Sequence, residues 1–299
     1  MRCAVFCKSF RDDFDRLTAL VESYERFVDP AVTMLVSVPD HDMALARLVL
    51  RGHDRVTLVT DESYTGVSAR SMGGWVHQQL CKLSVHRTGH ADSYFALDSD
   101  SYFIRPFGPA DFVNADGLPR FVASPVYTVY QAGNDLLFRI LEGAEVPTLP
   151  PVLAIEDGPR IDLRAARAAS AAQQDNSPGA RGPLLDLVFG AELRSLAFQP
   201  SQFLIAPVLQ AMEEELAAQG GSFAEVLSIA PWEYNWFASY CLYSRRFSCA
   251  PMMSPTIAFV SSDTVAEARR KGVTHTSLSR HFAAVQMAAR HHEETSLDR

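Results

Sequence analysis

The chain has 299 residues, of which 47% are hydrophobic and 21% are charged, and its net charge at pH 7 is −8. This size and composition indicate a globular protein with a sizeable core, in one large domain or two modest ones. The negative net charge argues against a general nucleic-acid binder or a protein that coats anionic membranes, because both need basic surfaces. A locally basic pocket is compatible with it.

The cysteine content and the N-terminus indicate a cellular compartment. Five cysteines, an odd number without paired spacing, fit a reducing cytosol better than a disulfide framework. The first residues form too short an apolar run for a signal peptide. No stretch approaches the roughly 18 apolar residues that a membrane span needs. The sequence therefore predicts a cytoplasmic protein without a membrane-spanning segment.

The first 60 residues alternate between apolar strands and amphipathic helices. Strands are predicted over residues 4–7, 33–38 and 56–60, with one helix ending before Pro30 and another over 42–50. This β-α-β-α-β order favours an α/β fold with a parallel sheet, which binds ligands at the carboxyl ends of its strands. The residues that fall at those ends are Lys8, Asp40, Asp61 and Asp98.

Two carboxylates follow a buried strand further along the chain. Residues 94–97 are aromatic and apolar, and Asp98 and Asp100 come directly after them. In extended backbone, side chains two residues apart leave on the same face, so both carboxylates can face one ligand while Ser99 points away. Paired carboxylates suit Mg²⁺ or Mn²⁺, which take oxygen ligands and share substrate phosphates. The alternative is a solvated strand end.

The Asp-x-Asp spacing also occurs at two places where local structure explains it. Asp13 and Asp15 open a predicted helix, whose dipole favours acidic residues. Asp42, two residues after Asp40, precedes a helical run and is interpreted as its N-cap. The copy at residues 98–100 has neither explanation, which favours the metal-binding interpretation.

A helix predicted over residues 75–83 carries three polar residues beside the strand of the carboxylates, namely Gln78, Gln79 and Lys82. Lys82 can neutralise a phosphate, and the paired glutamines can bind a sugar or a base. The alternative is an ordinary solvated helix face.

Residues 231–240 form a second informative stretch. Pro231 suits a first helical position, which leaves Glu233 in the first turn, where the helix dipole helps to keep it ionised. Glu233 is therefore the candidate general base, with a structural capping role as the alternative. Trp232 and Trp236 recur at helical spacing, so they fit either a sugar-stacking surface or the core.

The C-terminal region holds a basic run that ends at Lys271 and is followed by His275. Such a turn can bind a diphosphate and supply a late metal ligand. The alternative is a solvated basic helix end. Between residues 131 and 200 the sequence loosens, with an Ala-rich helix predicted over 164–172 and a flexible loop over 177–183.

Several of these segments resemble one known fold family. Leu97-Asp98-Ser99-Asp100, after an apolar strand in an N-terminal βαβ sheet, resembles the Asp-x-Asp motif of GT-A-fold glycosyltransferases. Lys8-Ser9-Phe10, the helix at 74–83 and Trp232-Glu233-Tyr234 resemble, more narrowly, a bacterial group of DUF-type GT-A-like proteins. The match covers residues 1–125 and 198–260. Asp-x-Asp is a weak motif, whereas the ordered combination of segments is more specific.

The resemblance implies a GT-A-like α/β fold with a mixed, mostly parallel central sheet flanked by helices. A single catalytic domain would span residues 1–260, with a nucleotide-sugar part at 1–125, an acceptor-side insertion at about 131–200 and a return to the core at 198–260. Residues 261–299 would form a C-terminal helical extension and tail.

The resemblance also implies transfer of a sugar from a UDP- or GDP-sugar to a hydroxyl of a saccharide or small molecule. Mn²⁺ or Mg²⁺, held by Asp98, Asp100 and His275, would offset charge on the departing diphosphate. Glu233 would deprotonate the acceptor in an inverting reaction. The residues expected to bind the donor are Lys8, Ser9, Asp61, Gln78, Gln79, Lys82, Ser99 and Lys271, and those expected to bind the acceptor are Trp232, Tyr234 and Trp236.

Three other functions compete with this one. A phosphatase of the haloacid-dehalogenase type also uses Asp-x-Asp after a strand, but it wants Thr or Val next, where this chain has Ser101 and Tyr102. A nucleotidyltransferase would want a Gly-rich basic loop near the N-terminus, and Lys8-Ser9-Phe10-Arg11 has no Gly. A non-catalytic GT-A-like protein that binds a sugar nucleotide or a partner protein stays open.

Overall fold

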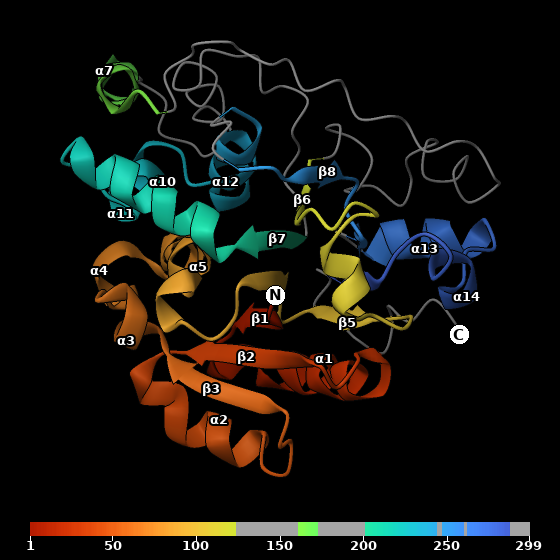
Figure 1. Cartoon of the computed structure of the whole chain (residues 1–299). Helices are drawn as coiled ribbons and strands as arrows, with labels where there is room; N and C mark the ends of the chain where they lie inside the picture. The colour runs from red at the N-terminus through yellow and green to blue at the C-terminus, as the bar shows by residue number, and fades with distance from the viewer. Residues whose placement is uncertain (124–160, 173–200, 244–246, 260–261, 288–299) are drawn as a thin grey trace.

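The computed structural model describes residues 1–123, 161–172, 201–243, 247–259 and 262–287 (Figure 1). Its central sheet has five strands in the order β3-β2-β1-β4-β7. The first four run parallel, and β7 is antiparallel to β4. The strands are β1 (Cys3–Lys8), β2 (Val32–Val38), β3 (Val56–Thr60), β4 (Ser93–Asp98) and β7 (Ser201–Ile205). The predicted α/β class, with a mixed, mostly parallel sheet, is confirmed.

Helices flank both faces of this sheet (Figure 1). Those that follow the strands in the N-terminal half are α1 (Phe14–Phe27), α2 (Met43–Val49), α3 (Asp61–Thr65), α4 (Ala69–Met72) and α5 (Gly74–Ser84). Those later in the chain are α7 (Leu163–Ala172), α10 (Ala206–Ala218), α11 (Phe223–Ile229), α12 (Glu233–Tyr243), α13 (Ser262–Arg270) and α14 (His275–Leu278). The helices predicted over 75–83 and 164–172 are therefore present as α5 and α7.

Alternate residues of β1 enter two different cores, because successive side chains of a strand leave on opposite faces. Ala4 and Phe6 belong to the core that also contains side chains of α5, α10, α11 and α12. Val5 and Cys7 belong to the core built with α1. A sheet that is buried on both faces explains why its strands are apolar throughout.

Two smaller sheets extend the fold beyond the central one. One has the order β5-β10-β9, with β5 (Ser101–Phe103) antiparallel to β10 (Ala284–Met287), which is parallel to β9 (Thr256–Phe259). In the other, β6 (Arg120–Val122) runs parallel to β8 (Ala250–Met252). The strand β5 continues from β4 through a turn at residues 99–100, so the small sheet begins where the two carboxylates lie.

The prediction of a helical extension after residue 260 needs correction. Helices α13 and α14 are present, but β10 inserts between β5 and β9, and side chains such as Val265, Leu278 and Val285 form a third core. Apolar burial and strand pairing therefore make residues 262–287 part of the fold. Residues 288–299 lie outside the described residues, as does most of the predicted insertion at 131–200, including the loop at 177–183.

The interpretation of Asp42 as an N-cap also needs correction. Asp42 holds the N-cap position of α2, but its side chain makes no capping hydrogen bond. It accepts hydrogen bonds from Arg11 instead, from Nε over 2.6 Å and from the backbone N–H over 3.1 Å. Burial by itself would raise the pKa of Asp42, but the hydrogen bonds from Arg11 outweigh burial and lower it.

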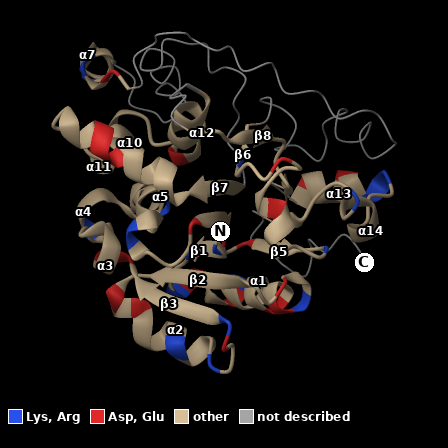
Figure 2. Ribbon diagram, viewed as in Figure 1, with Lys and Arg blue, Asp and Glu red and all other residues tan. Residues whose placement is uncertain are grey.

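The described residues include all five cysteines, each as a free thiol. Among the described helices, none combines the length and the apolar character that crossing a bilayer requires. Figure 2 shows acidic and basic residues distributed over many of the described elements. The cytoplasmic location stays a prediction.

Candidate functional site

The two carboxylates of the Asp-x-Asp motif converge at the carboxyl end of β4. Asp98 is the last residue of that strand, and Asp100 follows in the turn that leads into β5. Gln286 of β10 joins them, because its Nε2 donates to Asp98 Oδ2 over 3.2 Å and to Asp100 Oδ1 over 3.0 Å. The predicted convergence is therefore present, although a turn produces it and not the alternation of an extended strand.

Asp100 lies in an environment that disfavours its negative charge. Burial and then the neighbouring charge of Asp98 raise its pKa to about 6, while the hydrogen bond from Gln286 acts in the opposite direction. The Gln286 amide is neutral and cannot balance the carboxylate charge. The pair therefore favours an additional proton or cation beside Asp100.

Lys82 supplies the positive charge beside the other carboxylate of the pair, Asp98. Its Nζ lies 2.9 Å from Asp98 Oδ1 and 2.9 Å from Glu233 Oε1, and only 3% of its side chain is exposed. Burial by itself would lower the pKa of Lys82, but the charges of Asp98 and Glu233 outweigh it and raise the pKa well above its usual value. Gln78 also donates to Asp98 Oδ1, over 2.8 Å. This face of α5 is therefore not a solvated helix face.

Glu233 opens α12 and belongs to the same ionic cluster. Its side chain is buried beside Lys82. With the Gln79 amide oriented to satisfy its neighbours, the amide nitrogen donates to both Glu233 oxygens over 2.5 Å, and its oxygen accepts from Trp75 Nε1 over 3.0 Å. Burial raises the pKa of Glu233, and Lys82 acts against that rise. Lys82 thus links the candidate base to the candidate metal ligand Asp98.

The three aromatic residues expected at the acceptor occupy different environments. Trp232 is half-buried and packs edge-to-face on Trp75, with ring centroids 5.2 Å apart. Tyr234 is buried, its ring lies 4.6 Å from Lys82 Nζ, and its hydroxyl donates to Ala96 O over 3.5 Å.

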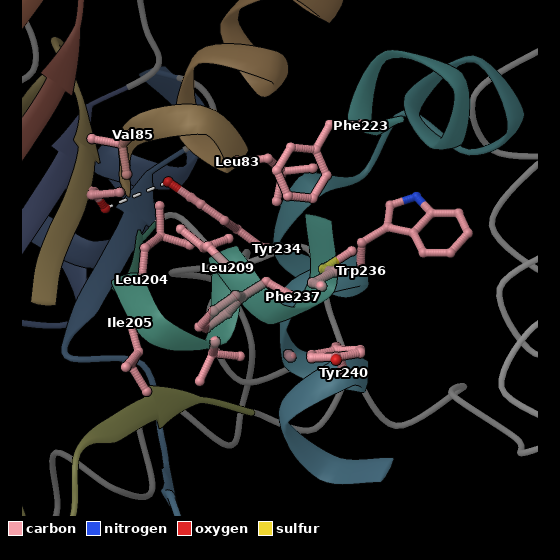
Figure 3. Close-up of a cluster of buried hydrophobic side chains, with 14 of the residues drawn as sticks. Leu83, Val85, Leu204, Ile205, Leu209, Phe223, Tyr234, Trp236, Phe237 and Tyr240 are labelled. Atoms are coloured by element: carbon pink, nitrogen blue, oxygen red, sulfur yellow. Dashed lines mark hydrogen bonds between the residues drawn. The ribbon is translucent and has the colours of Figure 1, made fainter. Parts of the chain in front are cut away.

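Trp236 belongs to the core and does not form an acceptor surface. Its exposed fraction is 0%, and its indole N–H donates to Ala230 O over 2.7 Å. Figure 3 draws it on α12 as one member of a cluster of buried hydrophobic side chains. The reason for the error is that aromatic spacing along a helix identifies one face but not what covers it.

A pocket of about 480 Å³ opens beside this cluster, a volume typical of small-molecule sites. It lies where β1 and β2 end and α5 begins, and Gln78 both lines it and contacts Asp98. Phe10 and Trp75 line it too, and each is 42% exposed. Neither ring was expected at the site from the sequence. The other lining residues are Lys8, Arg11, Asp12, Asp13, Pro39, His41, Asp42, Ala69 and Gly74.

The remaining residues expected at the donor lie around this pocket or beneath it. Lys8 lines the pocket, donates to Ser9 O over 2.8 Å and lies 3.2 Å from Asp61 Oδ2. Asp61 is completely buried and is paired with Lys8, which lines the pocket. Ser9 and Ser99 are both buried. The pKa of Asp13 is raised by burial, and a hydrogen bond from Ser99 partly opposes this rise.

His275 and Lys271 are not brought to the carboxylate pair. His275 Nε2 lies 2.8 Å from the hydroxyl of Tyr102, and Lys271 Nζ lies 3.5 Å from Glu267 Oε1. Within the described residues, the ligand atoms of Asp98, Asp100 and His275 do not gather within 4.8 Å of one another.

Gln286 is the late residue that reaches both carboxylates, and it was not among the site residues predicted from the sequence. A lone glutamine near the C-terminus carries no signal of its own. Only the pairing of β10 with β5, in which Gln286 lies opposite Ser101, brings it to the Asp-x-Asp turn.

Three solved glycosyltransferase structures are similar to this chain at low scores. A bifunctional glycosyltransferase, WbbM, in its apo form gives a TM-score of 0.46 at 11% identity, covering 95% of this chain and 45% of its own. The galactosyltransferase LgtC, in complex with donor and acceptor sugar analogs, gives a TM-score of 0.43 at 11% identity. The match covers 98% of this chain and 91% of LgtC. Mouse xyloside xylosyltransferase 1, in its apo form, gives a TM-score of 0.44 at 8% identity. The match covers 95% of this chain and 97% of the xylosyltransferase.

These likenesses are loose. All three scores fall below 0.5, so they bring no function to this chain, which spans less than half the length of WbbM. No curated protein matches the chain. Residues 4–128, which include the first four strands of the central sheet and the Asp-x-Asp turn, match a family described as being of unknown function, DUF6492.

Proposed function

We propose that this protein is a metal-dependent GT-A-type glycosyltransferase that moves a sugar from a UDP- or GDP-sugar to a hydroxyl of a saccharide or small molecule. The observation that carries the proposal is one ionic cluster in which Lys82 links Glu233 to Asp98, and Gln286 links Asp98 to Asp100. The cluster adjoins a pocket of suitable size through Gln78. A base and a pair of oxygen ligands beside one pocket are what sugar transfer from a diphosphate requires.

The carboxylate pair fits Mn²⁺ or Mg²⁺. Asp98 Oδ2 and Asp100 Oδ1 would hold the ion, because both already converge on one amide nitrogen and oxygen ligands suit these ions. The raised pKa of Asp100 supports the assignment, since burial and the charge of Asp98 outweigh the hydrogen bond from Gln286 and the charge of Arg16. When bound, the ion would offset the charge that develops on the departing diphosphate.

The pocket provides groups for the rest of the donor. Lys8 supplies a positive charge at the end of β1, which suits a phosphate as a point charge. The exposed rings of Phe10 and Trp75 offer flat surfaces for a base or a sugar. Lys82 has a different role from the one predicted, because it already balances Asp98 and Glu233. We assign it to positioning these two carboxylates.

Glu233 is the proposed base. Burial raises its pKa, which makes its carboxylate a stronger proton acceptor. It would take the proton of the acceptor hydroxyl while that oxygen attacks the anomeric carbon and the diphosphate leaves from the opposite side, so the configuration would invert. Trp232, packed on Trp75 at the pocket, is the proposed platform for the acceptor.

The proposal is tested by calorimetric titration of UDP and of GDP, each with and without Mn²⁺, on the wild type and on Asp100→Asn. We expect one nucleotide to bind only with Mn²⁺ and to lose this binding in Asp100→Asn. Asp116→Asn, at an exposed loop position, is the matched control and should bind as the wild type does. Absence of nucleotide binding under every condition would contradict the proposal.

A second assay separates an enzyme from a non-catalytic binder. Sugar nucleotides of the base identified by titration are incubated with the protein and Mn²⁺, and release of free nucleoside diphosphate is followed. Slow hydrolysis that Asp100→Asn abolishes supports a transferase. Metal-dependent binding without any release, with or without candidate acceptors, would favour a sugar-nucleotide-binding protein.

A further inference from the structure

A second cluster of metal-ligating side chains lies outside the proposed transfer site. Asp61 opens α3 directly after β3, and His77 and Cys81 lie four residues apart on α5. This spacing places the two α5 side chains on one helix face. All three residues are completely buried. One ligand atom from each lies within 4.8 Å of the other two.

The hydrogen bond of His77 Nε2 indicates which ring nitrogen of His77 carries a proton. His77 Nε2 lies 2.9 Å from the carbonyl oxygen of Val67. A carbonyl only accepts, so Nε2 carries a proton, and in the neutral ring Nδ1 then keeps its lone pair. Nδ1 lies 3.7 Å from Asp61 Oδ2 and 3.7 Å from Cys81 Sγ. A proton on Nε2 that is held by a backbone carbonyl is the usual arrangement for a histidine that binds a metal through Nδ1.

These separations are close to those of a tetrahedral zinc site. Bonds of about 2.0–2.3 Å to nitrogen, oxygen and sulfur place neighbouring ligand atoms roughly 3.3–3.6 Å apart. The two distances from His77 Nδ1 are 3.7 Å, a few tenths of an ångström above this range, and the Asp61 oxygen and Cys81 Sγ lie within 4.8 Å of each other. A mixed set of carboxylate, imidazole and thiolate suits Zn²⁺ better than Mg²⁺, which prefers oxygen ligands.

The surroundings of Asp61 orient its carboxylate for this role. Ser37 donates to Asp61 Oδ1 over 2.5 Å, and Tyr64 in turn donates to Ser37 over 2.9 Å. Asp61 Oδ2, the oxygen that faces His77, is buried without a hydrogen-bond donor among the described residues. Its cationic neighbour is Lys8, whose Nζ lies 3.2 Å away and which also lines the adjacent pocket.

We propose that Asp61, His77 and Cys81 form a structural binding site for a divalent transition metal of the Zn²⁺ class, separate from the carboxylate pair at Asp98 and Asp100. The ion would replace the ammonium of Lys8 as the counter-charge of Asp61 and would fasten α3 to α5. With Cys81 as thiolate, the two negative ligands would balance the charge of the ion.

Co²⁺ is the probe, because its spectrum reports both thiolate ligation and tetrahedral geometry. The full chain is treated with a chelator, freed of it and titrated with Co²⁺. We expect thiolate-to-Co²⁺ charge-transfer absorption in the near ultraviolet together with intense visible bands, and loss of both when Zn²⁺ is added. Absence of the charge-transfer absorption in the wild type would overturn the proposal.

Variants assign the ligands and separate this site from the transfer site. Cys81→Ser should lose the charge-transfer band, and His77→Gln should weaken Co²⁺ binding by about tenfold or more. Cys249→Ser, a half-buried thiol elsewhere, is the matched control, and Asp100→Asn should keep the full spectrum. Persistence of the band in Cys81→Ser, or its loss in Cys249→Ser, would contradict the assignment. Because the wild-type spectrum is decisive by itself, misfolding of one variant leaves the test intact.

Discussion

Gln286 and Asp100 lie 186 positions apart in the chain, and the side-chain amide of Gln286 donates to Asp100 Oδ1 over 3.0 Å. The same nitrogen donates to Asp98 Oδ2. Without metal, the neutral amide of Gln286 thus holds together, through two hydrogen bonds, two acidic side chains that would otherwise repel each other. The amide oxygen of the same side chain would suit a metal ligand if the amide turned over.

The first prediction concerns the two hydrogen bonds that Gln286 donates to Asp98 and Asp100. Gln286→Glu replaces a donor by an acceptor beside two carboxylates, so we expect the metal-free protein to lose about 1–3 kcal/mol of unfolding free energy. Mn²⁺ should then raise the melting temperature of the variant more than that of the wild type, since a third carboxylate strengthens the ion site. Thermal unfolding with and without Mn²⁺ measures both effects. Gln210→Glu, at an exposed glutamine of α10, serves as control, and equal metal-free stability of Gln286→Glu and the wild type would contradict the prediction.

The second prediction concerns pH. The pKa of Asp100 is about 6 in the folded protein and about 3.9 in an unfolded chain. Between these values the unfolded chain has released the proton while the folded state retains it, so stability falls as pH rises through this window. The fall due to Asp100 should be roughly 2–3 kcal/mol in the metal-free protein.

The same titration controls metal affinity, because a carboxylate must be deprotonated to bind an ion. Mn²⁺ affinity should therefore rise as pH increases toward 6 and level off above it. Urea unfolding and Mn²⁺ titration across pH 4–7 measure the two trends, and Asp100→Asn should remove its part of both. A metal-free stability difference between the wild type and Asp100→Asn that does not vary with pH would rule out the assigned pKa.

The third prediction concerns the buried ion pairs of Lys82. Lys82→Met leaves Asp98 and the buried Glu233 without their common cation, which should cost about 3–5 kcal/mol of unfolding free energy. The double variant Lys82→Met with Glu233→Gln should regain part of that loss, because the uncompensated charge is gone. Denaturant unfolding of the two variants measures this difference. Lys271→Met, at an exposed lysine, is the control, and failure of the second substitution to recover stability would argue against the pairing.

The fourth prediction separates the proposed base from donor binding. Glu233→Gln should lower turnover by about 10²–10⁴-fold, which is typical for loss of a general base. Metal-dependent nucleotide affinity should change little, since Glu233 contacts the donor side through Lys82 and Gln79 and does not line the pocket itself. Steady-state kinetics together with calorimetry distinguish the two effects. Near-normal turnover by Glu233→Gln would assign the proton transfer to another group.

The fifth prediction contrasts two tryptophans. Trp236→Ala should lose about 3–5 kcal/mol of unfolding free energy, because it empties a fully buried site. Trp75→Ala removes a 42% exposed ring from the pocket and should mainly weaken nucleotide or sugar binding. Unfolding curves and ligand titrations on both variants provide the comparison. A large loss of stability in Trp75→Ala with unchanged binding would place that ring in a structural role.

Local pattern predicted the central elements well. The alternation of apolar strands and amphipathic helices located β1, β2, β3 and α5 to within a few residues, because side-chain periodicity and helix-stop residues act over short distances. The order of these elements predicted the parallel part of the sheet, and the resemblance to GT-A-fold proteins implied that the sheet is mixed. Asp98 was located as a strand end for the same reason.

Side-chain environment was decided by contacts that are distant in the chain. The sequence presented Lys82 as a phosphate ligand, whereas the approach of α12, 151 positions later, pairs it with Glu233. Asp42 looked like an N-cap until β1 brought Arg11 beside it. In each case a charged side chain pairs with an oppositely charged residue that is distant in the chain. The local sequence does not reveal that residue.

The sequence by itself therefore determined the class of the fold, the position of the paired carboxylates and the candidate base at the start of a helix. Only the tertiary structure decided that Gln286, and not His275, reaches the carboxylates, and that His77 and Cys81 meet Asp61. The physical reason is that periodicity is a property of neighbouring residues. The composition of a site depends instead on strand pairing and helix packing between segments that are far apart in the chain.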